Sequence, residues 1–134
     1  CGEPLPGVEV VVVDPATRRP LPDGGVGELW VRGPNVASGY WNRPEASAET
    51  FDARLADGDP RSFLRTGDLA ALVDGEVFIT GRIKDLIVVR GRNHYPQDLE
   101  RTVERCDPRI RPGCTAAFAV EADGEERVVL VAEV

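Results

Sequence analysis

Residues 64–100 read LRTGDLAALVDGEVFITGRIKDLIVVRGRNHYPQDLE, and this stretch determines the predicted fold. An Asp-Gly pair between two apolar runs predicts a β-hairpin over residues 69–81, because this dipeptide adopts the positive φ angles of tight hairpin turns. With a two-residue turn Asp68 lies opposite Gly81, and one extra residue in the loop places it opposite Arg82. In either register the carboxylate and the guanidinium are close neighbours.

An acid and an arginine held side by side on a hairpin are suited to binding a nucleotide. The carboxylate of Asp68 can accept hydrogen bonds from two neighbouring ribose hydroxyls, and the guanidinium of Arg82 can bind a phosphate or ribose oxygen. The same spacing is also that of a surface ion pair, which contributes less than ~1 kcal/mol to stability. Spacing alone leaves both interpretations open.

The composition is acidic, with a formal net charge of −7 at pH 7. Such a charge argues against nucleic acid and anionic membranes as partners. Residues 82–92 are an exception with a local sum of +3, and they contain Lys84, the only lysine of the chain. A small positive region on an acidic protein is typical of a site for a phosphate-bearing ligand, although a solvated basic loop has the same composition.

The cysteine and histidine content argues against metal and disulfide chemistry. The three cysteines form no CxxC pair and the chain has one histidine, so we expect free thiols, no metal site and a reducing compartment. No apolar run approaches the length of a membrane span, and the first residues are not a signal peptide. The first residue is not methionine. We therefore expect a cytoplasmic segment of a longer protein, without membrane insertion.

The pattern before the hairpin predicts strands, turns and one short helix. A valine-rich run and a run that alternates Leu29 and Val31 with Glu28, Trp30 and Arg32 predict strands. A proline suits the first position of a helix. The expected elements are strands over residues 7–13 and 26–32, a helix over 44–51 and a polar loop over 52–62, with Trp30, Tyr40 and Trp41 in packed positions.

The pattern after Arg82 combines strands with one amphipathic helix, in which Leu99, Val103 and Cys106 share a face. The expected elements are a buried strand over residues 86–89, a turn over 91–93, a helix over 96–106, and strands over 115–120 and 127–134 about an Asp123-Gly124 turn. We predict a mixed α+β fold: a β-rich, barrel-like subdomain over residues 1–82, then part of a small α+β domain over 83–134.

Three motifs in this order, LRTGDLA, GRIKDLI and GRNHYPQDLE, resemble the C-terminal signatures of the adenylate-forming enzymes. This superfamily includes acyl-CoA ligases, nonribosomal-peptide adenylation domains and fatty acyl-AMP ligases. The upstream stretch GELWVRGPNVASGYWNRPEASAETF resembles the segment that these enzymes carry before their ribose-binding aspartate, so the resemblance covers nearly the whole chain. The unbroken RGRNHYPQDLE is most similar to the fatty acyl-AMP ligases.

The resemblance implies a role for each matching residue. Asp68 would bind the ribose hydroxyls of ATP and of the acyl-adenylate, and Arg82 would contact the ribose or phosphate side of the same nucleotide. Lys84 matches the hinge about which a small C-terminal lid domain turns between adenylation and acyl transfer. Residues 1–82 would then be the last part of the large domain, and residues 83–134 the first part of the lid.

Three residues beyond the hinge would contact the lid or the incoming thiol arm, with a solvated role of Arg92 and a structural role of His94 as the alternatives. Gly91 matches a position where the backbone approaches the site closely, and Arg92 and His94 follow it in the same motif. His94 is not expected to act as a general base, because a carboxylate substrate is already a nucleophile and the barrier lies in the charge of the phosphates.

The implied activity is that of a fatty acyl-AMP ligase, which uses ATP and Mg²⁺ to activate a fatty acid and passes the acyl group to the phosphopantetheine thiol of an acyl carrier protein. The superfamily's phosphate loop, its motif associated with magnesium and its C-terminal lysine are missing from these 134 residues. We therefore expect no catalytic residue and no Mg²⁺ ligand here, and no activity of the segment alone. The alternatives are a segment of an acyl-CoA ligase or amino-acid adenylation domain, and a non-catalytic module that docks a carrier protein.

Overall fold

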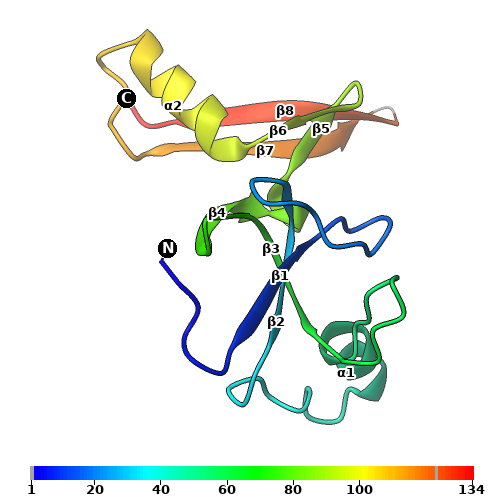
Figure 1. Ribbon diagram of the computed structural model, residues 1–134. Coiled ribbons are helices and arrows are strands. Elements are labelled where there is room, and N and C mark those ends of the chain that lie inside the picture. Colours follow the sequence, from blue (N-terminus) through cyan, green and yellow to red (C-terminus); the bar gives the residue numbers. More distant parts are fainter. Residues whose placement is uncertain (1, 123) are drawn as a thin grey trace. The chain divides into compact units, whose positions relative to one another are not determined.

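The structure is a computed structural model in which residues 2–122 and 124–134 are described. Contacts between residues fall into two compact units, Cys1–Ile83 and Lys84–Val134 (Figure 1). The division falls one residue after the predicted boundary. The assignment of the two units to a large domain and a lid stays a prediction.

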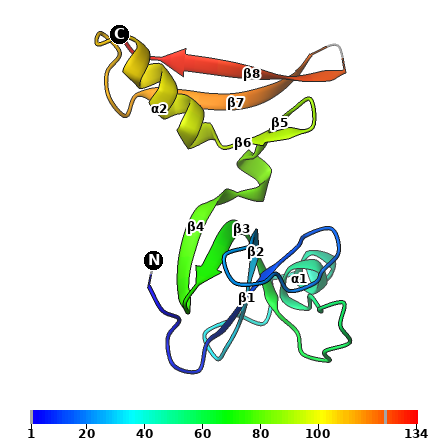
Figure 2. The ribbon, with the colours of Figure 1, turned by 45° about the horizontal axis from the view of Figure 1, so that its top comes forward.

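The first unit is an antiparallel sheet with one short helix (Figure 2). Its strands follow one another in the order β1-β2-β3-β4, and among the described residues β1 and β4 do not pair with each other. The mixed α+β class is thus confirmed, whereas the barrel-like subdomain is an open sheet rather than a closed barrel. The elements are β1 (Glu9–Val13), β2 (Val26–Arg32), α1 (Pro44–Phe51), β3 (Leu64–Val73) and β4 (Glu76–Arg82).

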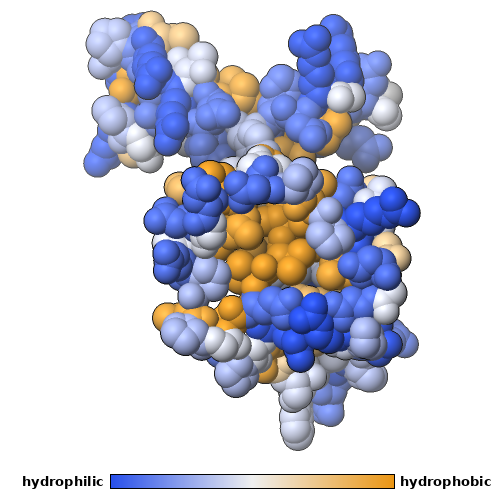
Figure 3. Space-filling model, in the orientation of Figure 1, coloured by the Kyte–Doolittle hydropathy of each residue, from blue (hydrophilic) through white to orange (hydrophobic). Residues whose placement is uncertain are grey.

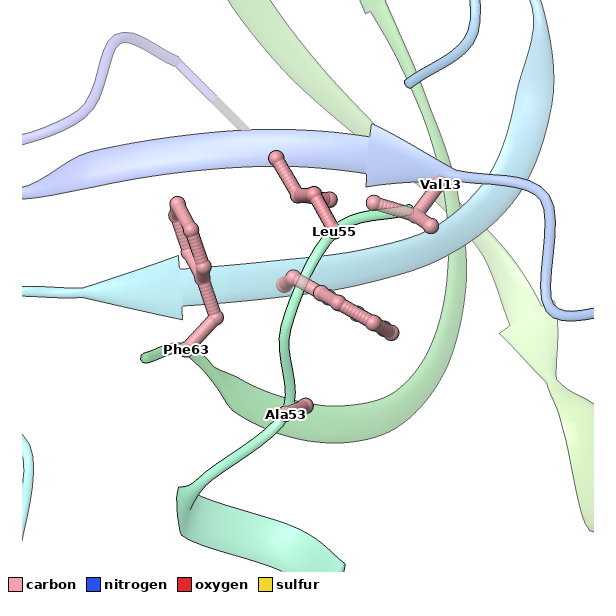
Figure 4. Close-up of a cluster of buried hydrophobic side chains, with 5 residues drawn as sticks. Val13, Ala53, Leu55 and Phe63 are labelled. Carbon is pink, nitrogen blue, oxygen red and sulfur yellow. The ribbon is translucent and has the colours of Figure 1, made fainter. Parts of the chain in front are cut away.

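Both faces of this sheet bury apolar side chains, because residues that alternate along a strand point to opposite faces. One face holds a cluster of Val12, Leu29, Ala70 and Val77. The other holds Val13 and Trp30 with residues from the segment after α1 (Figure 4), a cluster of Val13, Trp30, Ala53, Leu55 and Phe63. The prediction that Trp30 is packed is confirmed, since its exposed fraction is 1%.

The predicted polar loop over residues 52–62 also contributes to the core. Ala53 and Phe63 exchange two backbone hydrogen bonds of 3.1 and 2.8 Å, so the loop is closed at its base. Ala53 and Leu55 are 8% and 7% exposed, respectively. Ala53 stands between two polar residues and Leu55 is followed only by Ala56, and such short apolar stretches carry no periodic signal.

Two aromatic residues predicted to be packed are on the surface instead. Tyr40 is 53% exposed and Trp41 90% exposed. Tyr40 still has a partner, because its ring contacts the Phe51 ring edge-on with centroids 5.1 Å apart. Apolar residues also gather on the face of the first unit shown in Figure 3.

In its described residues the second unit contains two hairpins and one helix. The single 3₁₀ turn η1 (Ile83–Asp85) spans the division between the units. Helix α2 contacts β7, where the backbone N–H of the buried Ala117 donates to Glu100 Oε1 at 3.0 Å. The elements are β5 (Ile87–Val89), β6 (Arg92–His94), α2 (Pro96–Cys106), β7 (Thr115–Ala122) and β8 (Glu125–Ala132).

The bounds of α1 and α2 are as predicted, and the strands differ at their ends. The predicted turn over residues 91–93 is wrong, because Arg92 and Asn93 belong to β6 and the turn is formed by Arg90 and Gly91. β5 begins at Ile87 and exposes Val88, so it is not buried throughout. The predicted Asp123-Gly124 turn includes residue 123, which lies outside the described residues.

The β7–β8 hairpin exposes apolar side chains although it forms a regular ladder. Among the described residues, each of these strands pairs only with the other. Phe118, Val128 and Leu130 are 44%, 37% and 44% exposed. No helix within the described residues combines the length and the apolar character that a membrane span needs.

An ionic contact fastens the loop after α1 to the sheet. The Arg61 Nε donates to Asp59 Oδ2 at 2.8 Å, and the Arg61 Nη1 donates to Glu9 Oε2 of β1 at 2.8 Å. The hydrogen bonds from the side chain and the backbone N–H of Arg61 lower the pKa of Asp59 to about 2. The ordinary pKa of an aspartate is 3.8.

We expect Asp59→Asn to destabilise the protein at neutral pH and not at low pH. Because the pKa of Asp59 is lower in the folded state, its stabilising effect is fully present above pH ~4 and is lost as the pH falls toward 2. Urea unfolding of both proteins from pH 2 to 7, followed by circular dichroism, measures the difference. A difference in unfolding free energy that stayed constant over this range would contradict the expectation.

Candidate functional site

Asp68 is part of one irregularity of the sheet and lies close to a second. In the β2–β3 ladder Glu28 pairs with Leu69 and Trp30 pairs with Arg65, so three residues of β3 face the single residue between Glu28 and Trp30. These three residues, Thr66-Gly67-Asp68, are called the β3 excursion below. In the β3–β4 ladder Thr80 is the extra residue, between two regular pairings.

The second irregularity decides the register of Asp68. Val73 pairs directly with Glu76, so the turn has the predicted two residues, and Asp68 nevertheless pairs with Arg82. The extra residue that the second register required is not in the loop but is Thr80, inside strand β4. The Arg82 Nε donates to Asp68 Oδ1 at 3.1 Å. The two side chains are therefore brought together by a β-bulge rather than by the turn.

The pair has capacity for further hydrogen bonds. The side chains of Asp68 and Arg82 are 36% and 52% exposed. Within residues 2–122 and 124–134, Asp68 Oδ2 and the terminal nitrogens of Arg82 make no hydrogen bond to protein. A carboxylate has about four acceptor sites and a guanidinium has five donors, so this pair can bind a polar ligand without breaking its own contact.

A buried carboxylate supports the excursion from the sheet side. Glu28 is 1% exposed and is the only buried charged residue of the described chain. Its Oε2 accepts from Arg65 Nε at 3.1 Å and from Arg65 Nη2 at 3.0 Å, and its Oε1 accepts from the Gly67 backbone N–H at 3.3 Å. A cavity of about 270 Å³ adjoins these groups, lined also by Tyr40 and Thr66.

Thr66 fixes the excursion through its hydroxyl. Its Oγ1 donates to the Leu29 carbonyl at 2.7 Å and accepts from the Asp68 backbone N–H at 3.0 Å. Gly67 between them has a φ of +73°, in the left-handed region that favours glycine. The backbone on both sides of Gly67 is therefore held by specific partners.

Sequence reasoning missed Glu28, Arg65 and Thr66. One signal was available for Glu28. In a strand it shares a face with Trp30, which is separated from it by one residue, and Trp30 was expected to be packed. An acid on a packed face requires a basic partner. No comparable signal pointed to Arg65 or Thr66, because their contacts arise from the irregular ladder.

The other predicted site residues belong to the second unit. Lys84 is exposed and is the first residue of that unit. Arg92 and His94 lie on β6, paired with Val89 and Ile87 respectively. No contact described for these three residues tests their predicted roles.

Gly91 lies at the tip of the β5–β6 hairpin with a φ of +73°. A Cβ built on it would meet no atom within 4 Å, so within this chain the backbone conformation, and not crowding, favours glycine. Arg90, the other turn residue, also has a positive φ, of +50°. Left-handed backbone is uncommon for a residue with a side chain.

The described residues do not offer a metal site. They contain no group of three or more His, Cys, Asp or Glu side chains arranged to hold a metal ion. The expectation that a Mg²⁺ ligand lies elsewhere stays a prediction. Cys106 and Cys114 are free thiols, and burial raises the pKa of Cys114.

The chain is similar to known enzymes along its whole length. The model of the family described as AMP-binding enzyme matches residues 1–41. A medium-chain-fatty-acid–[acyl-carrier-protein] ligase, JamA of Moorena producens, is 54% identical over 134 residues, which are 100% of this chain and 23% of that protein. The chain is thus similar to AMP-binding enzymes. The resemblance to adenylate-forming enzymes is thereby confirmed.

A second relative and the solved structures agree with this family. The long-chain-fatty-acid–AMP ligase FadD26 of Mycobacterium tuberculosis is 47% identical over 136 residues, 98% of this chain and 22% of that protein. The chain spans about a fifth to a quarter of the length of these two relatives and matches a C-terminal part of them.

Among solved structures, an ATP-bound RpMatB-BxBclM chimera is similar with a TM-score of 0.81 at 36% identity, over 98% of this chain and 24% of that one. A structure from a study of fatty acyl-adenylate ligases of E. coli and L. pneumophila gives a TM-score of 0.75 at 38% identity, over 97% of this chain and 21% of that one. The matched parts of these two structures share the fold of the chain.

Proposed function

We propose that this chain is part of a fatty acyl-AMP ligase and supplies the ribose-binding edge and the hinge of that enzyme. The observation that carries the proposal is the contact of Arg82 Nε with Asp68 Oδ1 at 3.1 Å, in a chain whose relatives include a fatty-acid–AMP ligase and a fatty-acid–[acyl-carrier-protein] ligase. Residues 1–82 would end the large domain, and residues 83–134 would begin the lid.

The proposed reaction has two steps. A carboxylate oxygen of the fatty acid attacks the α-phosphorus of ATP, and the bond to pyrophosphate breaks, which gives acyl-AMP. The thiol sulfur of the carrier's phosphopantetheine arm then attacks the acyl carbonyl carbon, loses its proton, and AMP leaves. The carboxylate is already nucleophilic, so the protein contributes chiefly by position and by charge.

Asp68 and Arg82 would act by binding. The vicinal hydroxyls of the ribose would donate to the carboxylate of Asp68, whose Oδ2 has capacity for this, while Arg82 holds the carboxylate in place. The terminal nitrogens of Arg82 would bind a ribose or phosphate oxygen. Neither residue forms or breaks a covalent bond, so the chain would contribute nucleotide affinity rather than a catalytic group.

The second unit would contribute the moving part and the contact with the acceptor. Lys84, exposed in a single 3₁₀ turn, would be the pivot. Gly91, Arg92 and His94 would contact the thiol arm after the lid turns, with the guanidinium of Arg92 able to bind its phosphate. An enzyme that uses ATP and carrier thiols acts in the reducing cytoplasm, and this is the location we propose.

We expect Asp68→Asn in the full-length protein to weaken binding of a nonhydrolysable acyl-adenylate analogue. Loss of a charge-assisted hydrogen bond costs on the order of 1.5–3 kcal/mol, which is about 10- to 150-fold in affinity. Isothermal titration calorimetry measures the change. Asp74→Asn is the matched control, because Asp74 is exposed at the other end of the same hairpin and its φ of +50° is one that asparagine tolerates.

Equal analogue affinity of wild type and Asp68→Asn would contradict the ribose-binding role. If the full-length protein bound a carrier protein but no nucleotide analogue, the alternative of a non-catalytic docking module would be favoured.

The acceptor is tested by offering coenzyme A and a holo acyl carrier protein together to the full-length protein with ATP and a fatty acid. We expect the acylated carrier protein to be the main product, because the motif around His94 is most similar to the fatty acyl-AMP ligases. The isolated 134-residue chain, assayed in parallel, is expected to form neither product and to show no fatty-acid-dependent pyrophosphate exchange. Dominant acyl-CoA would favour an acyl-CoA ligase, and exchange driven by an amino acid would favour an adenylation domain.

We expect Lys84→Pro to slow acyl transfer at least tenfold in the full-length protein while adenylate formation changes little. Proline fixes φ and removes the backbone N–H, so a hinge at this position loses its freedom to turn. Lys84→Ala is the matched control, because it removes the charge and keeps the backbone free. Single-turnover assays of the two steps measure the effect, and equal transfer rates for the Pro and Ala variants would argue against the hinge.

A further inference from the structure

We propose that Glu28 is a positioning residue for nucleotide binding: its buried carboxylate holds the β3 excursion in place and thereby orients the carboxylate of Asp68. The proposal rests on the function proposed above for Asp68. It assigns a role to a residue of a different strand, 40 positions earlier in the chain, which contacts the backbone of the excursion and not Asp68 itself.

The first step is the cost of burying this charge. Glu28 is 1% exposed in the middle of a strand, flanked on the other face by the buried Leu29. A buried carboxylate is strongly unfavourable unless it is paired and hydrogen-bonded. Arg65 meets this requirement with two donors, at 3.1 and 3.0 Å from Oε2. An apolar pair of similar volume would often give the same stability as a buried ion pair. The presence of the ion pair here therefore calls for a specific explanation.

The second step is the contact that reaches the site. The other oxygen, Oε1, accepts the Gly67 backbone N–H at 3.3 Å, and Gly67 immediately precedes Asp68. The excursion has left the β2–β3 ladder, so its backbone groups have no strand partner there. Glu28 provides an acceptor in place of the missing strand partner and fixes the peptide that leads into Asp68.

The third step is that the two ends of the excursion are tied independently. Glu28 binds Arg65 before it and Gly67 within it, and the Thr66 hydroxyl joins the Leu29 carbonyl to the Asp68 N–H. A binding group must be held within about 0.5 Å of its productive position by partners outside the site. Here those partners are the Glu28 carboxylate and the Thr66 hydroxyl.

The test is a double-substitution cycle in the full-length protein. Affinity for a nonhydrolysable acyl-adenylate analogue is measured by calorimetry for wild type, Glu28→Gln, Asp68→Asn and the double variant. We expect Glu28→Gln to weaken binding about tenfold in the wild-type background and less than about twofold in the Asp68→Asn background, because residues that act through one another are not additive. A merely structural loss would weaken binding by the same factor in both backgrounds.

Glu76→Gln is the matched control, because Glu76 is an exposed acid of the same sheet at the far end of β4. The Glu76→Gln variant should bind the acyl-adenylate analogue with the same affinity as wild type. Should Glu28→Gln fail to fold, Thr66→Val and Thr66→Ser test the second set of hydrogen bonds that holds the β3 excursion, those of the Thr66 hydroxyl. Loss of the hydroxyl in Thr66→Val should weaken binding, and Thr66→Ser, which keeps the hydroxyl, should restore it.

Three results would overturn the inference. Unchanged affinity of Glu28→Gln, with Asp68→Asn still weakened, would remove the role of Glu28 and leave the proposed function intact. An equal loss in both backgrounds would show that Glu28 does not act through Asp68. Unchanged affinity of Asp68→Asn would remove the proposed function and with it this inference.

Discussion

The contact between the Glu28 carboxylate and the backbone of the β3 excursion is the constraint on which the geometry of the site depends. Three residues of β3 leave the ladder opposite Leu29, and without a partner their peptide groups would be free to take other conformations. The carboxylate that holds them is buried and carries its own counter-ion, Arg65. A charge in this place gives directed hydrogen bonds, which an apolar core does not provide.

The Asp68–Arg82 ion pair, unlike the buried Glu28–Arg65 pair, is partly exposed and contributes little to stability. Both side chains are partly exposed, and ion pairs of this kind contribute about 0–1 kcal/mol to stability. The fold therefore does not require the pair, which leaves its unsatisfied donors and acceptors available to a ligand. The bulge at Thr80 costs one regular pairing of the sheet and in return aligns the two charged groups. The buried contact of Glu28 on β2 and the partly exposed contact of Asp68 on β3 are thus neighbouring but separate.

Local sequence signals were sufficient to predict the regular helices, strands and turn, but not the irregular parts of the strands. Pro44 and Pro96 each open a helix, and both helices have the predicted bounds. The Asp74-Gly75 turn also has the predicted length. Thr80 was not recognised as a bulge, because an inserted residue is decided by how the side chains on each face pack and not by its own identity. Motif resemblance pointed to Asp68, whereas the contacts of Glu28 with Arg65 and Gly67 join two strands and could be found only in three dimensions.

The open β7–β8 hairpin has a consequence for handling the chain by itself. Its outer edges carry backbone donors and acceptors that no described strand takes up, and Phe118, Val128 and Leu130 lie exposed beside them. A free strand edge with apolar neighbours is a template for adding another strand. Isolated copies at high concentration would therefore be drawn into edge-to-edge association, a tendency that dilution or a charged substitution on β8 would counter.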